Sequence, residues 1–163
     1  MTAPGRKFLN VTGILIIIFS AFAVLFSISQ LFSIDSWIVD WNGSRLAWQI
    51  EYTIFAFIGF YGAFVGIMGV SNQYNVEKAS LLRVLAIINI VLLAFFRFVL
   101  TDILGTTSAT ADDLNIVYVL LGLLLLAVEN GVLALYLIGA VKNKRAFNAQ
   151  NNEQNYAAEN FKD

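Results

Sequence analysis

The chain has 163 residues, of which 59% are hydrophobic and 13% charged, and its formal net charge is −1. A soluble domain of this size is typically about 45–50% apolar and about 25% charged. One small core does not have room for the surplus apolar side chains, so the composition predicts an integral membrane protein whose apolar surface faces lipid. The lack of a basic excess gives no indication of a nucleic-acid partner.

Cysteine and histidine are both absent. Their absence excludes disulfides, thiol catalysis and iron–sulfur clusters, and it removes the usual ligands of zinc and haem. The sequence contains no nucleophile–base pair or phosphate-binding loop, so we expect no enzymatic activity, no cofactor and no metal. A secretory-pathway eukaryotic protein usually carries cysteines on its outer face, so a bacterial plasma membrane is the expected location of this multi-pass protein.

Four apolar segments predict transmembrane helices, at about 8–32, 50–70, 81–100 and 114–141. Each reaches the roughly 20 residues that cross a bilayer core, and helices are the form that satisfies the backbone in lipid. The predicted fold is an all-α integral membrane protein with an antiparallel four-helix transmembrane bundle in residues 1–145. Residues 146–163, rich in Asn, Gln, Ala and Glu, predict a disordered polar cytoplasmic tail that is either inert or a docking segment.

The basic residues of the flanks and loops are distributed unequally. Only Arg45 falls in the loops of one side, whereas the other side holds Arg6, Lys7, Lys78, Arg83, Lys142, Lys144 and Arg145. Because Lys and Arg are retained on the cytoplasmic side, this asymmetry predicts that both termini are cytoplasmic.

Two intramembrane charges, Arg97 and Glu129, form the first candidate site. Each lies roughly 20 Å along its helix from the predicted cytoplasmic edge, and consecutive antiparallel helices are usually neighbours. The equal depth predicts that the two side chains face each other within the bundle. One interpretation is structural, in which the pair sets the helix register. Another is functional, in which Glu129 is a proton or cation site gated by Arg97. In a third, Arg97 has no such role and its side chain extends to the outer interface. Asn89 and Asn130 are further polar groups able to hydrogen-bond across helices.

The last predicted helix also carries a stripe of small and polar residues: Tyr118, Gly122, Glu129 and Tyr136. Their spacing puts them near one helical face. Lipid offers Glu and Tyr hydroxyls no partners, so this face is expected to point inward, either as a packing seam or as the lining of a pocket.

The second predicted helix carries a glycine series, Gly59, Gly62, Gly66 and Gly69, at spacings of 3, 4 and 3 residues. Small residues let helix backbones approach closely in a membrane. We expect this seam to pack against the first helix, where Gly13, Ser20 and Ser27 recur every seven residues. A homodimer seam or a contact with another membrane protein is the alternative.

Three tryptophans, Trp37, Trp41 and Trp48, lie in the first predicted outer loop, residues 33–49. Trp favours the headgroup layer of a bilayer. The spacing predicts a short interfacial helix or a re-entrant hairpin in which all three serve as anchors. A surface that recognises carbohydrate or peptide is the alternative.

These features together predict a non-catalytic accessory, assembly or partner-binding subunit of a membrane. Its expected partners are the lipid bilayer and either another membrane protein or further copies of the chain, with no nucleic acid. The alternative is a small transporter or channel subunit that uses Glu129 with Arg97.

Overall fold

The computed structural model describes residues 3–37, 44–104 and 116–160. Its elements in chain order are α1 (Arg6–Trp37), α2 (Arg45–Ser71), α3 (Ala79–Phe95), the π-helical segment η2 (Phe96–Leu100), α4 (Thr101–Leu104) and α5 (Ile116–Asn160). The described ranges contain no strand. The prediction of an all-α protein is therefore confirmed.

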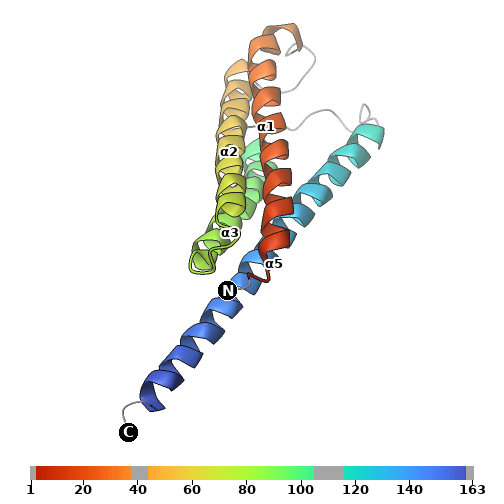
Figure 1. The fold of residues 1–163 in the computed structure, drawn as a ribbon. Coiled ribbons are helices and arrows are strands. Elements are labelled where there is room, and N and C mark those ends of the chain that lie inside the picture. Colours follow the sequence, from red (N-terminus) through yellow and green to blue (C-terminus); the bar gives the residue numbers. More distant parts are fainter. Residues whose placement is uncertain (1–2, 38–43, 105–115, 161–163) are drawn as a thin grey trace.

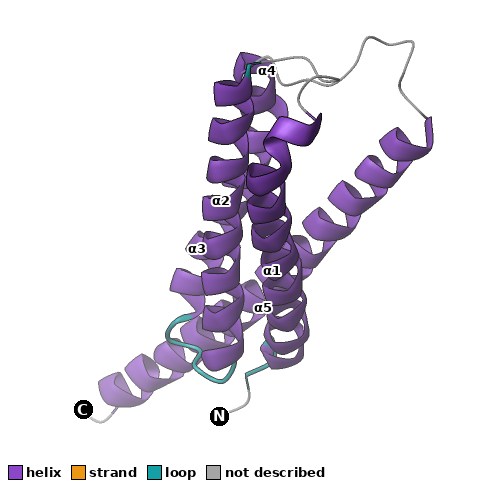
Figure 2. Ribbon diagram, turned by 90° about the horizontal axis from the view of Figure 1, so that it is seen from above, coloured by secondary structure: helices purple, strands orange, loops and turns teal. Residues whose placement is uncertain are grey.

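Three helices are long and apolar enough to cross a membrane, over Arg6–Ile34, Arg45–Ser71 and Ala79–Leu100. They lie side by side in Figure 1 and again in the turned view of Figure 2. These spans correspond to the first three predicted transmembrane helices. The fourth predicted helix begins at residue 114, outside the described residues, and its crossing of a membrane stays a prediction.

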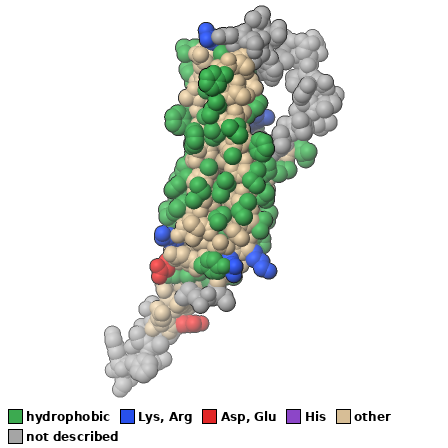
Figure 3. Space-filling view, turned by 45° about the horizontal axis from the view of Figure 1, so that its top comes forward, with side chains coloured by type: hydrophobic (Ala, Val, Ile, Leu, Met, Phe, Trp, Pro, Cys, Tyr) green, Lys and Arg blue, Asp and Glu red, His purple; other side chains and the backbone are tan. Residues whose placement is uncertain are grey.

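The outer surface of these helices is apolar (Figure 3). Large side chains from all three helices are more than half exposed: Phe22, Leu25, Phe57, Phe60, Val91 and Phe98. A soluble monomer rarely exposes apolar area on this scale. Lipid is the solvent in which such a surface is stable.

The glycine series packs inside the chain, where Gly59, Gly62, Gly66 and Gly69 are all buried. A Cβ added at Gly66 would lie 2.6 Å from the carbonyl oxygen of Gly13, and one added at Gly59 would lie 3.2 Å from that of Ser20. The backbones of α1 and α2 are therefore in direct contact along this seam. Gly69 instead makes room for the ring of Tyr136 from α5.

Two tyrosine hydroxyls link neighbouring helices through backbone carbonyls. Tyr61 of α2 donates to the oxygen of Leu85 in α3 at 3.2 Å, and Tyr136 of α5 donates to the oxygen of Val65 in α2 at 3.0 Å. Tyr136 is fully buried. Because lipid provides no competing partner, these bonds favour one arrangement of the helices.

Helix α5 crosses the other helices obliquely rather than running alongside them (Figures 1 and 2). Among the residues of α5 whose burial the structure describes, the buried ones lie in a short central stretch: Val132, Leu133, Tyr136, Gly139, Ala140 and Asn143. The N-terminal half of α5 diverges from α1 and α3 in both views. The arrangement is thus a body of three helices with a fourth packed across it through its middle.

The same helix runs to Asn160, through most of the segment whose composition predicts disorder. No Gly or Pro follows Gly139, and extending a formed helix avoids the cost of nucleation. The polar tail is therefore a continuation of α5 over residues 146–160.

The N-terminus, the α2–α3 connection and the C-terminal part of α5 lie at the same end of the molecule (Figure 1). The Arg6 guanidinium lies over the ring of Tyr74 at 4.2 Å, and the Lys142 ammonium lies over the ring of Phe8 at 4.4 Å. Figure 3 shows basic side chains gathered at this end. Basic residues of the predicted cytoplasmic side thus lie at one end of the molecule.

Candidate functional site

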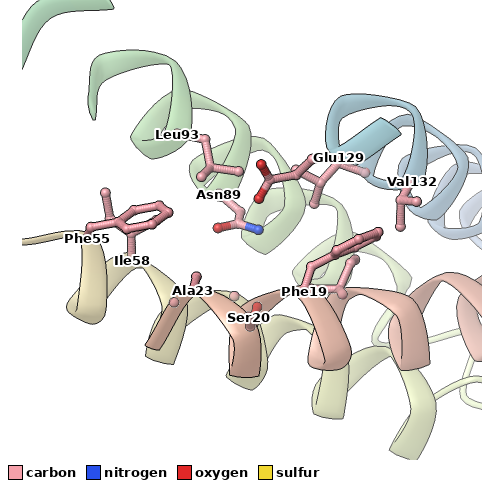
Figure 4. Close-up of a pocket in the computed structure, with 13 residues that line it drawn as sticks. Phe19, Ser20, Ala23, Phe55, Ile58, Asn89, Leu93, Glu129 and Val132 are labelled. Carbon is pink, nitrogen blue, oxygen red and sulfur yellow. The ribbon is translucent and has the colours of Figure 1, made fainter. Parts of the chain in front are cut away.

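A small pocket lies within the helical body, where the four long helices meet (Figure 4). Its polar wall consists of Ser20 from α1, Asn89 from α3 and Glu129 from α5, and α2 contributes Gly62. The remaining wall is apolar, formed by Ile16, Phe19, Ala23, Phe55, Ile58, Gly59, Leu93, Val132 and Leu133. The cavity volume is about 20 Å³, enough for a water molecule or an ion of similar size. Organic ligands need pockets of about 300–1,000 Å³.

The pocket lies near the middle of the helices that are long and apolar enough to cross a membrane, where polar groups would be most costly in a bilayer. Ser20 stands at the middle of the span Arg6–Ile34, and Asn89 stands at the middle of Ala79–Leu100. Polar side chains at such a depth usually face the interior and serve packing or function. Both residues are almost fully buried, with exposed fractions of 8% for Ser20 and 3% for Asn89.

Gly62 provides the space in which this polar wall forms. A Cβ at Gly62 would collide with the Ser20 hydroxyl oxygen and would lie 3.7 Å from Asn89 Nδ2. The glycine therefore lets polar groups from α1 and α3 approach across α2. This role adds to the packing function that the spacing of the glycines predicts.

Asn89 carries unsatisfied hydrogen-bonding capacity in the pocket, beside the Glu129 carboxylate. The Oδ1 atom of Asn89 is buried and accepts no hydrogen bond from any residue that the structure describes. Figure 4 shows the Glu129 carboxylate and the Asn89 amide side by side, with the amide nitrogen on the side nearer the carboxylate. Buried polar oxygens without partners are rare in proteins. This wall is therefore suited to accept a proton, a water or a cation.

Arg97 lies outside the pocket, on the exposed surface of η2. The preceding residue, Phe96, is buried and stacks on Phe55 at 4.7 Å between ring centroids, which directs the next position outward. The Arg97 charge acts on Glu129 electrostatically. However, the structure brings Asn89, and not Arg97, to the pocket beside Glu129, because α5 diverges from α3 beyond that level (Figure 1).

The other predicted residues of α5 lie in different surroundings. Asn130 is on the exposed side of the helix. Tyr136 is buried in the packing interface with α2, outside the pocket. Tyr118 and Gly122 lie within α5, but their surroundings fall outside what the structure describes. Of the predicted stripe, Glu129 therefore lines a pocket and Tyr136 serves packing.

Trp48 lies in α2 rather than in the outer loop in which it is predicted. Helix α2 begins earlier than its apolar run indicates, because the Ser44 hydroxyl accepts a hydrogen bond from the Ala47 N–H at 3.1 Å and caps the helix. Trp48 is thus helical, only 5% exposed, and stacked on Tyr52 at 5.9 Å. Trp37 ends α1 with its side chain outside the described part, and Trp41 lies outside the described residues altogether.

Asn143 is a connecting residue that the sequence analysis missed. Its Oδ1 accepts from the Gly5 N–H at 2.7 Å, and its Nδ2 donates to the Gln73 carbonyl at 3.3 Å. It is fully buried and joins the N-terminus, the α2–α3 connection and α5. The sequence does contain a signal that could have predicted its inward position. Asn143 continues a helical face at spacings of 4, 3, 4 and 3 residues. That face consists of Glu129, Leu133, Tyr136, Ala140 and Asn143.

Replacing Asn143 with alanine is expected to destabilise the basic end of the molecule by about 1–3 kcal/mol, because it leaves a buried N–H without its acceptor. Hydrogen exchange followed by mass spectrometry should show faster exchange near residues 5–9 and 72–76, with little change in the middle of α2. The exposed neighbour Asn148 provides a matched Asn→Ala control. Equal exchange in the two variants would contradict this role.

Together the helices and the pocket define an all-helical protein with three helices able to span a membrane and a small polar pocket among its helices. No family model, no curated protein and no solved structure matches the chain.

Proposed function

We propose that this chain is a non-catalytic accessory subunit of the bacterial cell membrane that binds a partner protein through the cytoplasmic extension of α5. The observation that carries the proposal is the length of that helix. Its 45 residues correspond to about 68 Å at 1.5 Å per residue, whereas a bilayer core is about 30 Å thick. After a fourth crossing, α5 would still extend several turns beyond the membrane surface.

The surface of this extension suits protein binding. Residues 151–154 are exposed and uncharged apart from Glu153. A helix that is polar on all sides gains little from its own packing, so a partner is the natural source of its stabilisation. Between the extension and the α2–α3 connection lies an open groove of about 470 Å³. The groove is lined by Tyr74, Asn75, Val76, Glu77, Phe147, Gln150, Asn151 and Gln154, a mixture of apolar and amide groups that fits a peptide segment.

The orientation of the proposed subunit follows from its charges. The end that holds this groove also holds Arg6 over the ring of Tyr74, Lys144 over the ring of Phe147, and Lys78 next to Asn75. The positive-inside rule favours the cytoplasm for that end. The bound segment would accordingly belong to the cytoplasmic part of a membrane-associated partner.

A chain that ends at Phe147 is expected to insert and fold but to lose its partner. Native mass spectrometry of the complex in mild detergent should find a stoichiometric partner with the full chain and none with the shortened one. A chain of full length with residues 148–163 in shuffled order is the matched control for composition. A full chain that always purifies alone, or a shortened chain that keeps the same partner at the same stoichiometry, would rule out this function.

A further inference from the structure

We propose that the pocket formed by Ser20, Asn89 and Glu129 binds one monovalent cation of about the size of sodium. This site is separate from the cytoplasmic groove and does not depend on the docking function. It also departs from the expectation, based on the absence of His and Cys, that the chain holds no metal ion. Its chemistry uses oxygen atoms alone.

The ligand set consists of one carboxylate, one amide oxygen and one hydroxyl, contributed by three different helices. Hard cations prefer carboxylate, carbonyl and hydroxyl oxygens of this kind. Asn89 Oδ1 is the decisive atom, because it is buried with no hydrogen-bond partner among the described residues, in a side chain that is only 3% exposed. For a bound cation to contact that oxygen and the Glu129 carboxylate at the same time, the Asn89 amide turns over, which exchanges the places of its oxygen and nitrogen.

The charge of the pocket favours a single positive charge. Glu129 is the only ionisable residue among those that line it, so a monovalent ion makes the site neutral, whereas a divalent ion would leave a net positive charge at mid-membrane depth. Burying an unbalanced charge in a membrane is costly.

The size of the pocket limits it to one small ion. Its cavity volume of about 20 Å³ corresponds to roughly one water-sized particle, which leaves no room for an organic cation. Among bare monovalent ions, sodium is smaller than potassium and approaches the carboxylate more closely, so its attraction to Glu129 is stronger. Gly62 maintains this volume, because any side chain there would displace the Ser20 hydroxyl. The site therefore requires contributions from all four long helices, and an ion bound there should stabilise the whole assembly.

The first test uses the full-length, wild-type chain in detergent at constant ionic strength. Sodium chloride, potassium chloride and choline chloride are compared by thermal unfolding. A ligand that binds only the folded state raises Tm, by on the order of 3–6 °C for a chain of this size when its concentration is ten times Kd. We expect that rise with sodium, a smaller one with potassium and none with choline.

The second test measures binding directly with radioactive sodium, for which we expect one ion per chain. Glu129→Gln should abolish binding, and Asn89→Leu should weaken it at least tenfold. Glu153→Gln makes the same chemical change at an exposed carboxylate and should bind like the wild type. Where a pocket variant does not fold, the comparison of salts on the wild-type chain decides.

The proposal is overturned if the wild-type chain has the same Tm in all three salts and binds no radioactive sodium. It is equally overturned if sodium binds but Glu129→Gln and Asn89→Leu bind it as tightly as Glu153→Gln does. A dependence of Tm on pH without any difference between the salts would show that a proton occupies Glu129 in place of a metal ion.

Discussion

Replacement of Gly66 with leucine is expected to prevent stable packing of α1 against α2, with a loss of about 3 kcal/mol or more in the free energy of unfolding. A Cβ at this position would lie 2.6 Å from the carbonyl oxygen of Gly13, 2.7 Å from Ile17 Cγ1 and 3.1 Å from Ile17 N. Two of these atoms belong to the backbone of α1, so no change of rotamer relieves the clash and the helices must separate. Unfolding in detergent mixtures with increasing SDS measures the loss.

Gly131 provides a matched control for this substitution. It is also inside a helix, yet a Cβ there has no neighbour within 4 Å. Gly131→Leu should leave stability unchanged or raise it by up to about 1 kcal/mol, because leucine has the higher helix propensity. If Gly66→Leu were as stable as this control, the close approach of α1 and α2 would be wrong.

Gly66→Leu also distinguishes a glycine seam that packs α1 against α2 within one chain from a seam between two copies of the chain. All four glycines of α2 are buried within one chain, so Gly66→Leu should lower stability without a change from dimer to monomer. A folded variant of unchanged stability but smaller size in detergent would place the seam between copies of the chain instead.

Tyr136→Ala is expected to release α5 from the other helices, at a cost of roughly 2–4 kcal/mol. The side chain is fully buried, its ring lies against Gly69, and its hydroxyl donates to the Val65 oxygen. Truncation of a buried aromatic residue leaves a cavity and typically costs about 3–5 kcal/mol in soluble proteins. The value should be lower here, because in lipid the helices associate without a hydrophobic driving force.

Tyr136→Phe separates the ring from the hydroxyl. It removes only the hydrogen bond and should cost about 0.5–1.5 kcal/mol. Leu135→Ala is the matched control, since this neighbouring residue is 44% exposed and loses few protein contacts when truncated. Unfolding in SDS measures stability, and limited proteolysis of α5 reports its release. Equal losses for Tyr136→Ala and Leu135→Ala would contradict the anchoring role.

The three spanning helices were predictable because their signal is local. A run of about 20 apolar residues must form a helix in lipid, whatever its neighbours are. The glycine series was predictable for a related reason, since spacings of three and four residues place it on one helical face. The first residue of α2 was harder to predict, because the cap at Ser44 extends the helix beyond its apolar run and brings Trp48 into it.

The site itself was only partly predictable. Glu129 and Asn89 stand out as polar residues in apolar segments, but Ser20 is an ordinary membrane-helix residue that matters because it lies opposite Gly62. Equal depth favoured Arg97 as the neighbour of Glu129, and the structure places Asn89 there. Depth along a helix follows from residue number, whereas the direction of a side chain depends on how neighbouring helices are rotated and crossed.

The amino-acid sequence alone indicated that the chain is helical, that four of its segments are suited to a membrane, and which residues are too polar for lipid. The structure describes three of these segments as helices long and apolar enough to cross one. Only the tertiary structure decided that α5 crosses the other helices through its middle, that Asn143 ties three segments together, and that Ser20, Asn89 and Glu129 share one pocket. The physical reason is that helix formation in lipid depends on local backbone hydrogen bonds, whereas helix association depends on the fit of surfaces far apart in the chain.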